Sequence, residues 1–192
     1  MPPKCKFTKN EIIQAALCIA KTAGIDAITA RALGAQLCAS SKPIFSIFKN
    51  MEEVQQEVIK AAKKEYNQYI KTGLSQTPAF KGVGTQYIIF AQKEPKLFQL
   101  LFMTEQPEKK DSLGMLPLLD DNYNKIVSSI QTDYGLNESD AKKLYRHLWI
   151  YTHGIASLLA TNVCNFADSE ISNMLTEVFK SLLKQIKEQQ AQ

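Results

Sequence analysis

Apolar side chains recur along this chain mainly every three or four residues, the spacing of one face of an α-helix, whereas alternation with a period of two is scarce. The clearest start signal is the pair Thr8 and Glu11, because a threonine and a glutamate three residues later can cap each other's backbone N–H groups. A helix is therefore predicted from Lys9 up to Gly24, a residue typical of helix ends. Its predicted inner face consists of Ile12, Ile13, Ala16, Leu17 and Ala20.

Two short helices are predicted next, joined by a tight turn. Thr29 is placed to cap a helix over residues 30–37, and Ser40 to cap another that runs from Ser41 to about Phe48. Only residues 38–40 separate the two helices. Pro43 falls in the first turn of the second helix, where its missing N–H has no intrahelical partner to lose.

The remaining chain continues the helical pattern, so the fold class is predicted to be all-α. Further helices are predicted over residues 51–71, after Thr77-Pro78, after Glu94-Pro95, and over 116–134, 138–163 and 169–189, with a loop over 104–114. We expect an N-terminal three-helix head over residues 1–50 and a larger helical domain over 51–192. No Gly/Pro linker separates them, which predicts rigid coupling.

The last two predicted helices favour a dimer seam, as half of a four-helix bundle. Gly154, Ser157 and Ala160 leave room for another helix to approach closely. The final helix keeps an apolar stripe for about four turns. That stripe is made of Ile171, Met174, Leu175, Val178, Phe179, Leu182, Leu183 and Ile186.

Charge is unevenly distributed along the 192 residues. Residues 1–50 hold seven Lys and Arg against two acidic residues, a net charge of 7 − 2 = +5, and the rest holds 16 against 17, or −1. A basic head suggests a polyanionic partner, with nucleic acid as the leading candidate and a merely lysine-rich surface as the alternative. No apolar run approaches the roughly 18 residues of a membrane span, and no secretory signal is recognised, so a cytoplasmic address and no membrane partner are expected.

Motifs for catalysis are not found in the sequence. There is no His-Glu-x-x-His, Gly-x-Ser-x-Gly or Gly-x-x-x-x-Gly-Lys-Ser/Thr, and His153 and Cys164 lack further metal ligands at suitable spacing. An enzyme is therefore not expected, and no cofactor or metal is predicted. Gly82-Val-Gly84 is interpreted as a helix irregularity and Asp120-Asp121 as a solvated pair on a helix surface. We interpret the four cysteines as small buried apolar residues, with redox sensing as the alternative: Cys5, Cys18, Cys38 and Cys164.

Two short helices joined by a three-residue turn in a basic segment are the layout of a helix-turn-helix, whose second helix enters the DNA major groove. Residues 28–54 read ITARALGAQLCASSKPIFSIFKNMEEV. This stretch is similar to the pattern Thr-x-Arg-x-Ile-Ala…Gly-Val-Ser…Leu-Tyr-x-x-Phe-x-x-Lys-x-x-Leu of the TetR-type (tetracycline-repressor-like, TetR/AcrR) bacterial transcriptional regulators. The resemblance covers about a quarter of the chain. It implies an all-helical homodimer with a DNA-binding head and a body that dimerises and often holds an inducer.

The resemblance also implies roles for individual residues. By position, Thr29 and Arg31 contact phosphates and Lys49 contacts the DNA backbone. The residues implied to face the groove are Ser41, Lys42, Pro43 and Ser46, and those implied to form the core of the head are Ala32, Leu33, Leu37, Ile44 and Phe48. Two positions depart from the pattern. Phe45, which is also predicted to contact DNA, replaces the usual tyrosine and lacks its phosphate-binding hydroxyl. Cys38 replaces the usual turn glycine, so a positive φ would be uncomfortable there if the turn is unchanged.

A weaker resemblance covers Leu148–Leu158, which is similar to a Trp-x-x-x-His-Gly-x-x-x-Leu segment of one group of TetR-type C-terminal domains. Trp149 and His153 share a helical face and could line a cavity, the alternative being a core tryptophan and a satisfied buried imidazole. Large residues in this region predict a mostly apolar ligand site, although core packing produces the same composition. The predicted lining is Tyr87, Phe90, Phe98, Phe102, Met103, Tyr123, Trp149 and His153, with Tyr123 or His153 as polar handles.

These features together predict a DNA-binding transcriptional regulator. The expected partners are a second copy of the chain, a pseudo-palindromic duplex operator and a small apolar inducer that releases a repressor from that operator. The competing class is a helical adaptor or oligomerisation protein that uses its basic head on a non-DNA partner. Ser41, Lys42 and Ser46, next to the phosphate-type residues Thr29 and Arg31, favour DNA.

Overall fold

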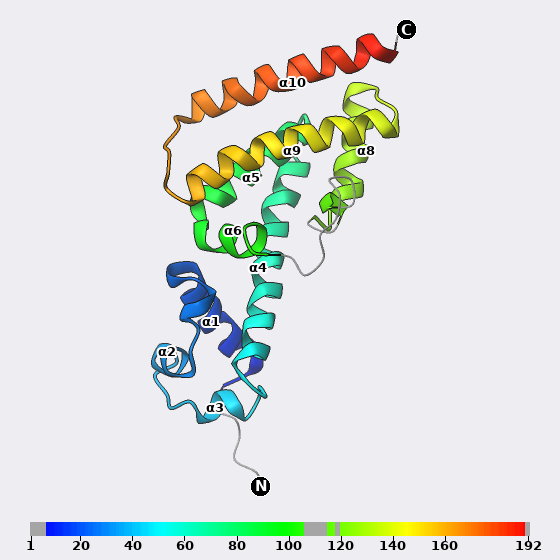
Figure 1. The fold of residues 1–192 in the computed structure, drawn as a ribbon. Coiled ribbons are helices and arrows are strands. Elements are labelled where there is room, and N and C mark those ends of the chain that lie inside the picture. The colour runs from blue at the N-terminus through cyan, green and yellow to red at the C-terminus, as the bar shows by residue number, and fades with distance from the viewer. Residues whose placement is uncertain (1–6, 106–114, 118–119, 191–192) are drawn as a thin grey trace. The chain divides into compact units, whose positions relative to one another are not determined.

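The computed structural model describes residues 7–105, 115–117 and 120–190, and all regular structure among them is helical (Figure 1). This confirms the all-α prediction. The chain divides into two compact units. Unit 1 comprises Met1–Tyr66 and Glu94–Thr104, and unit 2 comprises Asn67–Lys93 and Glu105–Gln192. None of the helices that the structure describes combines the length and the hydrophobicity of a membrane span.

Unit 1 contains α1 (Lys9–Ala23), the 3₁₀ turn η1 (Ile25–Ala27), α2 (Ala30–Gln36), α3 (Lys42–Phe45), α6 (Pro95–Phe102) and the first part of α4 (Met51–Leu74). The capping box that begins α1 is confirmed: Thr8 Oγ1 accepts from the Glu11 N–H at 3.2 Å and Glu11 Oε2 accepts from the Thr8 N–H at 2.7 Å. Gly24 ends α1 with a φ of 88°. Of the predicted inner face only Ile13 is half-buried, and the other four residues are buried.

Helix α6 completes the core of unit 1. It packs against α1, and its Leu97 and Phe98 are fully buried. Phe98 and Phe102 lie with ring centroids 5.2 Å apart, and Phe102 meets Tyr66 of α4 edge-on at 5.0 Å. The apolar face of α6 is therefore used inside unit 1.

Unit 2 contains the last part of α4, α5 (Ala79–Lys93), α8 (Tyr123–Tyr134), α9 (Glu138–Ala160) and α10 (Asp168–Gln190). Helix α9 is central, because it packs against α5, α8 and α10 (Figure 1). Its start is fixed by Asn137, whose Oδ1 accepts from the Asp140 N–H at 2.9 Å. The side chains that α9 buries are Ala141, Leu144, Tyr145, Leu148, Thr152, Ile155, Ala156 and Ala160.

The interpretation of Gly82-Val-Gly84 as a helix irregularity is wrong, because α5 runs unbroken through both glycines. Gly82 lies against Gly73 of α4 instead. A Cβ at Gly82 would overlap the Gly73 carbonyl oxygen, and a Cβ at Gly73 would lie 2.7 Å from the carbonyl group of Gly82. The two glycines therefore allow two helix backbones to touch.

The predicted helix over residues 116–134 is also wrong at its start, since α8 begins at Tyr123. Residues 115–117 are helical and residue 120 is not. The reason is an Asx turn, in which Asp120 Oδ1 accepts from the Asn122 N–H at 2.8 Å and competes with helical hydrogen bonding. The end at Gly135 is confirmed, with a left-handed φ of 66°. The predicted loop over 104–114 lies outside the described residues except for Thr104 and Glu105.

Two other expectations are corrected by burial. Asp120 is not a solvated residue, because only 2% of it is exposed, although Asp121 is on the surface. The cysteines are not small core residues: Cys18 and Cys38 are exposed and Cys164 is half-buried, while Cys5 lies outside the described residues. Cys18 directly follows the buried Leu17, and successive helical residues point about 100° apart, so the thiol faces outward.

Candidate nucleic-acid interface

The turn between α2 and α3 is a Schellman motif. Thr29 caps the start of α2 through the Ala32 N–H at 3.1 Å, as predicted. At its end the Cys38 N–H donates to the Ala35 carbonyl at 3.0 Å and the Ala39 N–H donates to the Gly34 carbonyl at 2.9 Å. Cys38 occupies the left-handed position of this motif, with a φ of 50°. A residue other than glycine therefore adopts the positive φ that the sequence marks as unfavourable at this position.

Gly34 holds the turn against α2, a role that the sequence analysis missed. A Cβ there would lie 2.9 Å from the Ala39 carbonyl oxygen, which is closer than side-chain atoms normally approach. The residue is buried. A glycine in the middle of a short helix, four residues before a turn, was the available signal.

Helix α3 is shorter than predicted and is not capped by Ser40. It spans Lys42–Phe45 with Ser41 as the N-terminal flanking residue, whose backbone is helical and whose side chain makes no capping bond. Pro43 lies in the first turn, as expected. The next helix is capped soon afterwards, because Asn50 Oδ1 accepts from the Glu53 N–H at 2.9 Å and Glu53 Oε2 accepts from the Lys49 N–H at 2.8 Å.

Buried residues fix which face of α3 is turned outward. Ile44 is fully buried and Phe48 is 2% exposed, and both pack into unit 1 together with Leu33. Ala32 and Leu37, the other predicted core residues, are half-buried. The side chains that the resemblance assigned to DNA lie on the remaining surface of this segment or at its edge.

Six of the eight predicted DNA-contacting residues are exposed. They are Thr29, Arg31, Lys42, Phe45, Ser46 and Lys49, and the half-buried two are Ser41 and Pro43. Two hydroxyls already take part in local bonds, because Thr29 accepts from α2 and Ser46 Oγ donates to the Pro43 carbonyl at 2.7 Å.

Three unpaired cations lie on this segment. No carboxylate of the described residues lies within ion-pairing distance of Arg31, Lys42 or Lys49. By contrast, Lys9 pairs with Glu57 at 3.4 Å and its ammonium lies 5.5 Å from the centre of the Phe48 ring. Three positive charges that no described carboxylate neutralises therefore lie on α2, on α3 and at Lys49.

A second lysine of α1 is neutralised by residues that lie far along the chain. Lys21 Nζ lies 2.5 Å from Glu65 of α4 and 3.1 Å from Glu94, the residue before α6. Burial opposes the charge of Lys21, but the two carboxylates outweigh it and raise the pKa of the ammonium. The net +5 of residues 1–50 therefore overstates the exposed charge, because counting along the sequence cannot show these pairs.

The residues predicted to line a ligand site are divided between the units. Phe98, Phe102 and Met103 belong to unit 1, where the two phenylalanines pack as described and Met103 is exposed. Phe90 and Tyr123 belong to unit 2. Phe90 is fully buried with its ring 5.2 Å from that of Tyr69, and Tyr123 lies 5.6 Å from the Tyr145 ring.

Tyr87, Trp149 and His153 form one cluster in unit 2. The His153 ring stacks on Trp149 with centroids 4.7 Å apart and an interplanar angle of 9°. Its Nδ1 lies 2.9 Å from the Tyr87 hydroxyl and its Nε2 lies 3.4 Å from Ser157 Oγ. Burial raises the pKa of Tyr87 well above 10 and lowers the pKa of His153, so Tyr87 keeps a proton to donate and His153 is neutral at pH 7. The imidazole is thus satisfied, as in the alternative interpretation, although Trp149 and His153 are only half-buried.

A comparison with known protein families identifies a match over the C-terminal part of the chain. The model described as "Tetracyclin repressor-like, C-terminal domain" matches residues 80–184, more than half of the chain. The chain belongs to the TetR-type family of transcriptional regulators. No curated protein matches it significantly. The matched region runs from α5 into α10, so it is separate from residues 28–54, which carry the N-terminal resemblance.

Unit 2 of this TetR-type regulator contains a buried carboxylate, that of Asp120. Asp120 accepts from the Tyr145 hydroxyl at 3.4 Å, in addition to its bond with Asn122. Burial and the nearby carboxylate of Asp120 raise the pKa of Tyr145 well above 10. Asn122 donates to Asn67 Oδ1 at 3.2 Å, which ties the start of α8 to the last part of α4.

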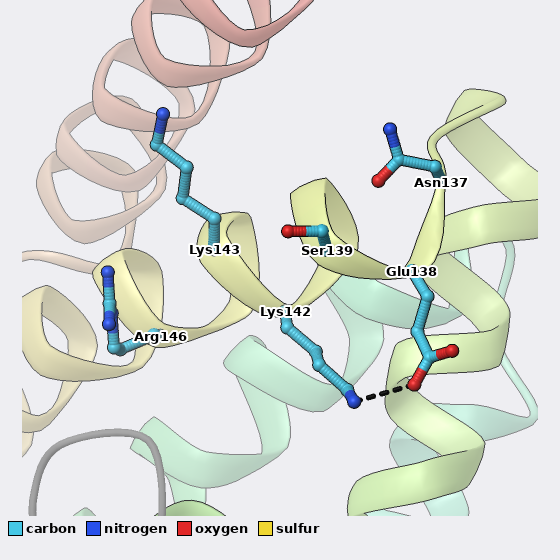
Figure 2. Close-up of a pocket in the computed structure, with 6 residues that line it drawn as sticks. All are labelled: Asn137, Glu138, Ser139, Lys142, Lys143 and Arg146. Carbon is cyan, nitrogen blue, oxygen red and sulfur yellow. Dashed lines mark ion pairs between the residues drawn. The ribbon is translucent and has the colours of Figure 1, made fainter.

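A shallow groove at the start of α9 is lined by residues of polar and charged type (Figure 2). Lys142 lies 2.6 Å from Glu138, and Lys143 donates to Gln189 of α10 at 3.0 Å. The lining is Asn137, Glu138, Ser139, Lys142, Lys143 and Arg146. None of the residues predicted for an apolar ligand belongs to this lining.

Proposed function

We propose that this TetR-type regulator binds a pseudo-palindromic duplex DNA operator as a homodimer, acts as a repressor, and is released by a small, mostly apolar ligand. The observation that carries DNA binding is the set of exposed, unpaired Arg31, Lys42 and Lys49 on a helix-turn-helix segment whose inner face is held by Ile44 and Phe48. A helix with its side chains is about as wide as the major groove, roughly 12 Å, so α3 fits as the element that enters it.

A gel shift tests this proposal most directly, with the DNA upstream of the protein's own coding sequence as the probe and a random-sequence selection as a second source of sites. A dimer that neutralises roughly 6–10 phosphates should give a plot of log K against log[salt] with a slope of about −5 to −9. A slope near zero would remove DNA as the partner. Absence of any sequence-selective shift would favour the helical adaptor.

Lys42→Ala should weaken binding because it removes an unpaired cation from α3. If Lys42 contacts a guanine, selectivity should also fall, by about 1–3 kcal/mol at one base pair. Lys60→Ala is the matched control, since Lys60 is an exposed lysine of the same unit that pairs with Glu57 at 3.1 Å. Equal affinities for wild type and Lys42→Ala would mean that α3 does not enter the groove.

The proposed dimer seam is the outer face of α9 and α10. Six of the eight apolar stripe residues of α10 are only half-buried, and Ile150 and Leu158 of α9 are exposed. A Cβ at Gly154 would meet nothing within 4 Å, so this face of α9 is open to an approaching helix. Ile150→Asp should dissociate the dimer in analytical ultracentrifugation, whereas Ile59→Asp, at an exposed isoleucine of unit 1, should not. A wild-type protein that stays monomeric at all concentrations would contradict the seam.

Ligand release rests on the cluster of Tyr87, Trp149 and His153, which offers aromatic surface with two polar atoms. A ligand can shift DNA affinity only by its differential affinity for two states, typically about 1–3 kcal/mol. Screening apolar compounds should identify ones that raise the thermal stability and release DNA together. A compound that stabilises the protein, loses this effect in Trp149→Ala and leaves DNA affinity unchanged would contradict the coupling.

A further inference from the structure

Phe45 is the only exposed aromatic side chain among the described residues, with 48% of its surface accessible. The other exposed large apolar residues are aliphatic: Ile59, Met103, Ile150, Leu158 and Val163. Phe45 is also the only one of the six that lies on the helix-turn-helix segment. An aromatic ring has thus been placed on the surface that otherwise presents hydroxyls and unpaired cations.

The packing of α3 prevents this ring from turning inward. Ile44, its immediate neighbour, is fully buried, and Phe48 four residues later is 2% exposed. Successive helical residues point about 100° apart, so a rotation that buried Phe45 would expose Ile44. Phe45 instead shares a face with Lys42, three residues before it, and with Ser41, four residues before it.

The chemistry of a phenyl ring narrows what it can contact on DNA. It has no hydrogen-bond donor or acceptor, so it cannot bind a phosphate or a polar base edge as a tyrosine hydroxyl would. The major groove presents one apolar group, the C5 methyl of thymine, and phenylalanine is among the side chains that pack against it. Its neighbours Lys42 and Ser46 are polar and can read only the other base edges.

We propose that Phe45 packs against the C5 methyl group of a thymine in each operator half-site and makes affinity depend on that methyl. This inference rests on the proposed DNA binding and adds a specificity-determining residue to it. Phe45 selects thymine by apolar contact, and Lys42 on the same face supplies the polar contact.

The test uses the full-length protein and an operator found by the gel shift above. Each thymine is replaced by deoxyuridine, which removes the methyl and nothing else, at the same position in both half-sites. Loss of one buried methyl, about 0.8 kcal/mol, corresponds to roughly a four-fold rise in Kd per half-site and roughly 10- to 15-fold for both. One thymine pair should show this loss, and 5-methylcytosine placed there in the uracil operator should restore part of the affinity.

Phe45→Ala should bind more weakly and should lose the difference between thymine and uracil at that position. Ile59→Ala, which removes an exposed apolar side chain of the same unit outside α3, should keep the full difference. If the alanine variant binds too weakly to measure, Phe45→Leu should give a difference smaller than that of wild type. Circular dichroism should show all three variants folded, because both side chains are exposed.

The outcomes separate this inference from the proposed function. Selective DNA binding without a methyl-sensitive position, or with the same sensitivity in the Phe45 variants as in wild type, overturns the Phe45 contact and leaves DNA binding intact. Absence of selective DNA binding overturns both.

Discussion

Replacing Cys38 by glycine should stabilise the protein. Cys38 lies at the left-handed position of the Schellman motif that ends α2, with a φ of 50°. This conformation costs an L-residue other than glycine about 1–2 kcal/mol. Glycine removes that cost but loses more backbone entropy on folding, about 0.5–1 kcal/mol. Since the Cys38 side chain is exposed and contributes little packing, the net gain should be about 0.5–1 kcal/mol.

The assay is urea unfolding followed by circular dichroism under reducing conditions, so that exposed thiols do not cross-link. The midpoint should rise at constant m, and the melting temperature should rise by about 1–4 °C for a chain of this length. Cys38→Val should move both in the opposite direction, because a β-branched side chain tolerates a positive φ less well.

Asn162 provides a matched control elsewhere in the fold. It occupies the same position of a second Schellman motif, after α9, with a φ of 56° and bonds from Asn162 and Val163 to the Leu159 and Leu158 carbonyls. Asparagine tolerates this conformation, so Asn162→Gly should change the free energy of unfolding much less. The reasoning fails if Cys38→Gly leaves stability unchanged or lowers it.

Three further predictions concern other contacts. Gly82→Ala should destabilise the protein by about 1–3 kcal/mol because its Cβ meets the Gly73 backbone. Gly84→Ala in the same helix, where a Cβ meets nothing within 4 Å, should stabilise the protein by about 0.5–1 kcal/mol. Equal denaturation midpoints for the two variants would contradict the close helix contact. Lys21→Met should cost about 1–2 kcal/mol by leaving Glu65 and Glu94 without their shared partner, and Lys142→Met, which breaks a surface pair, less than about 0.5 kcal/mol in the same assay. Burial lowers the pKa of His153, so the contribution of the neutral imidazole to stability is present above about pH 6.5 and declines as the pH falls through the lowered pKa. In unfolding experiments at several pH values, His153→Gln should flatten this decline more than His147→Gln does. An unchanged decline in His153→Gln would show that His153 does not cause it.

Local signals in the sequence were sufficient where a helix end depends on neighbours within four residues. The capping box at Thr8, the cap at Thr29 and the glycine after α8 were all predicted from such signals and are confirmed. The start of α8 was not, because the side chain of Asp120 replaces helical hydrogen bonds there, and a helical periodicity does not show that competition.

Contacts between residues that lie far apart in the chain could not be predicted from the sequence. Glu65 and Glu94 lie 44 and 73 residues from the lysine they share, so net charge by segment could not show that Lys21 is neutralised. In the same way, Gly82 could be recognised as unusual in a helix but not as the partner of Gly73. For the candidate interface, the resemblance named the residues, while the burial of Ile44 and Phe48 was needed to show which of them face outward.

The division of the chain into units has a consequence for how the protein is made. The polypeptide leaves unit 1 after Tyr66, returns to it at Glu94 and leaves it again after Thr104. During synthesis, residues 1–66 therefore emerge before α6, whose Leu97 and Phe98 fill the core beside α1. The nascent α1 must wait for about 40 further residues, two to eight seconds at typical translation rates, before α6 covers its apolar surface. A chain shortened after residue 66 keeps every residue assigned to DNA but loses this cover, so solubility and binding have to be measured on a protein that includes α6.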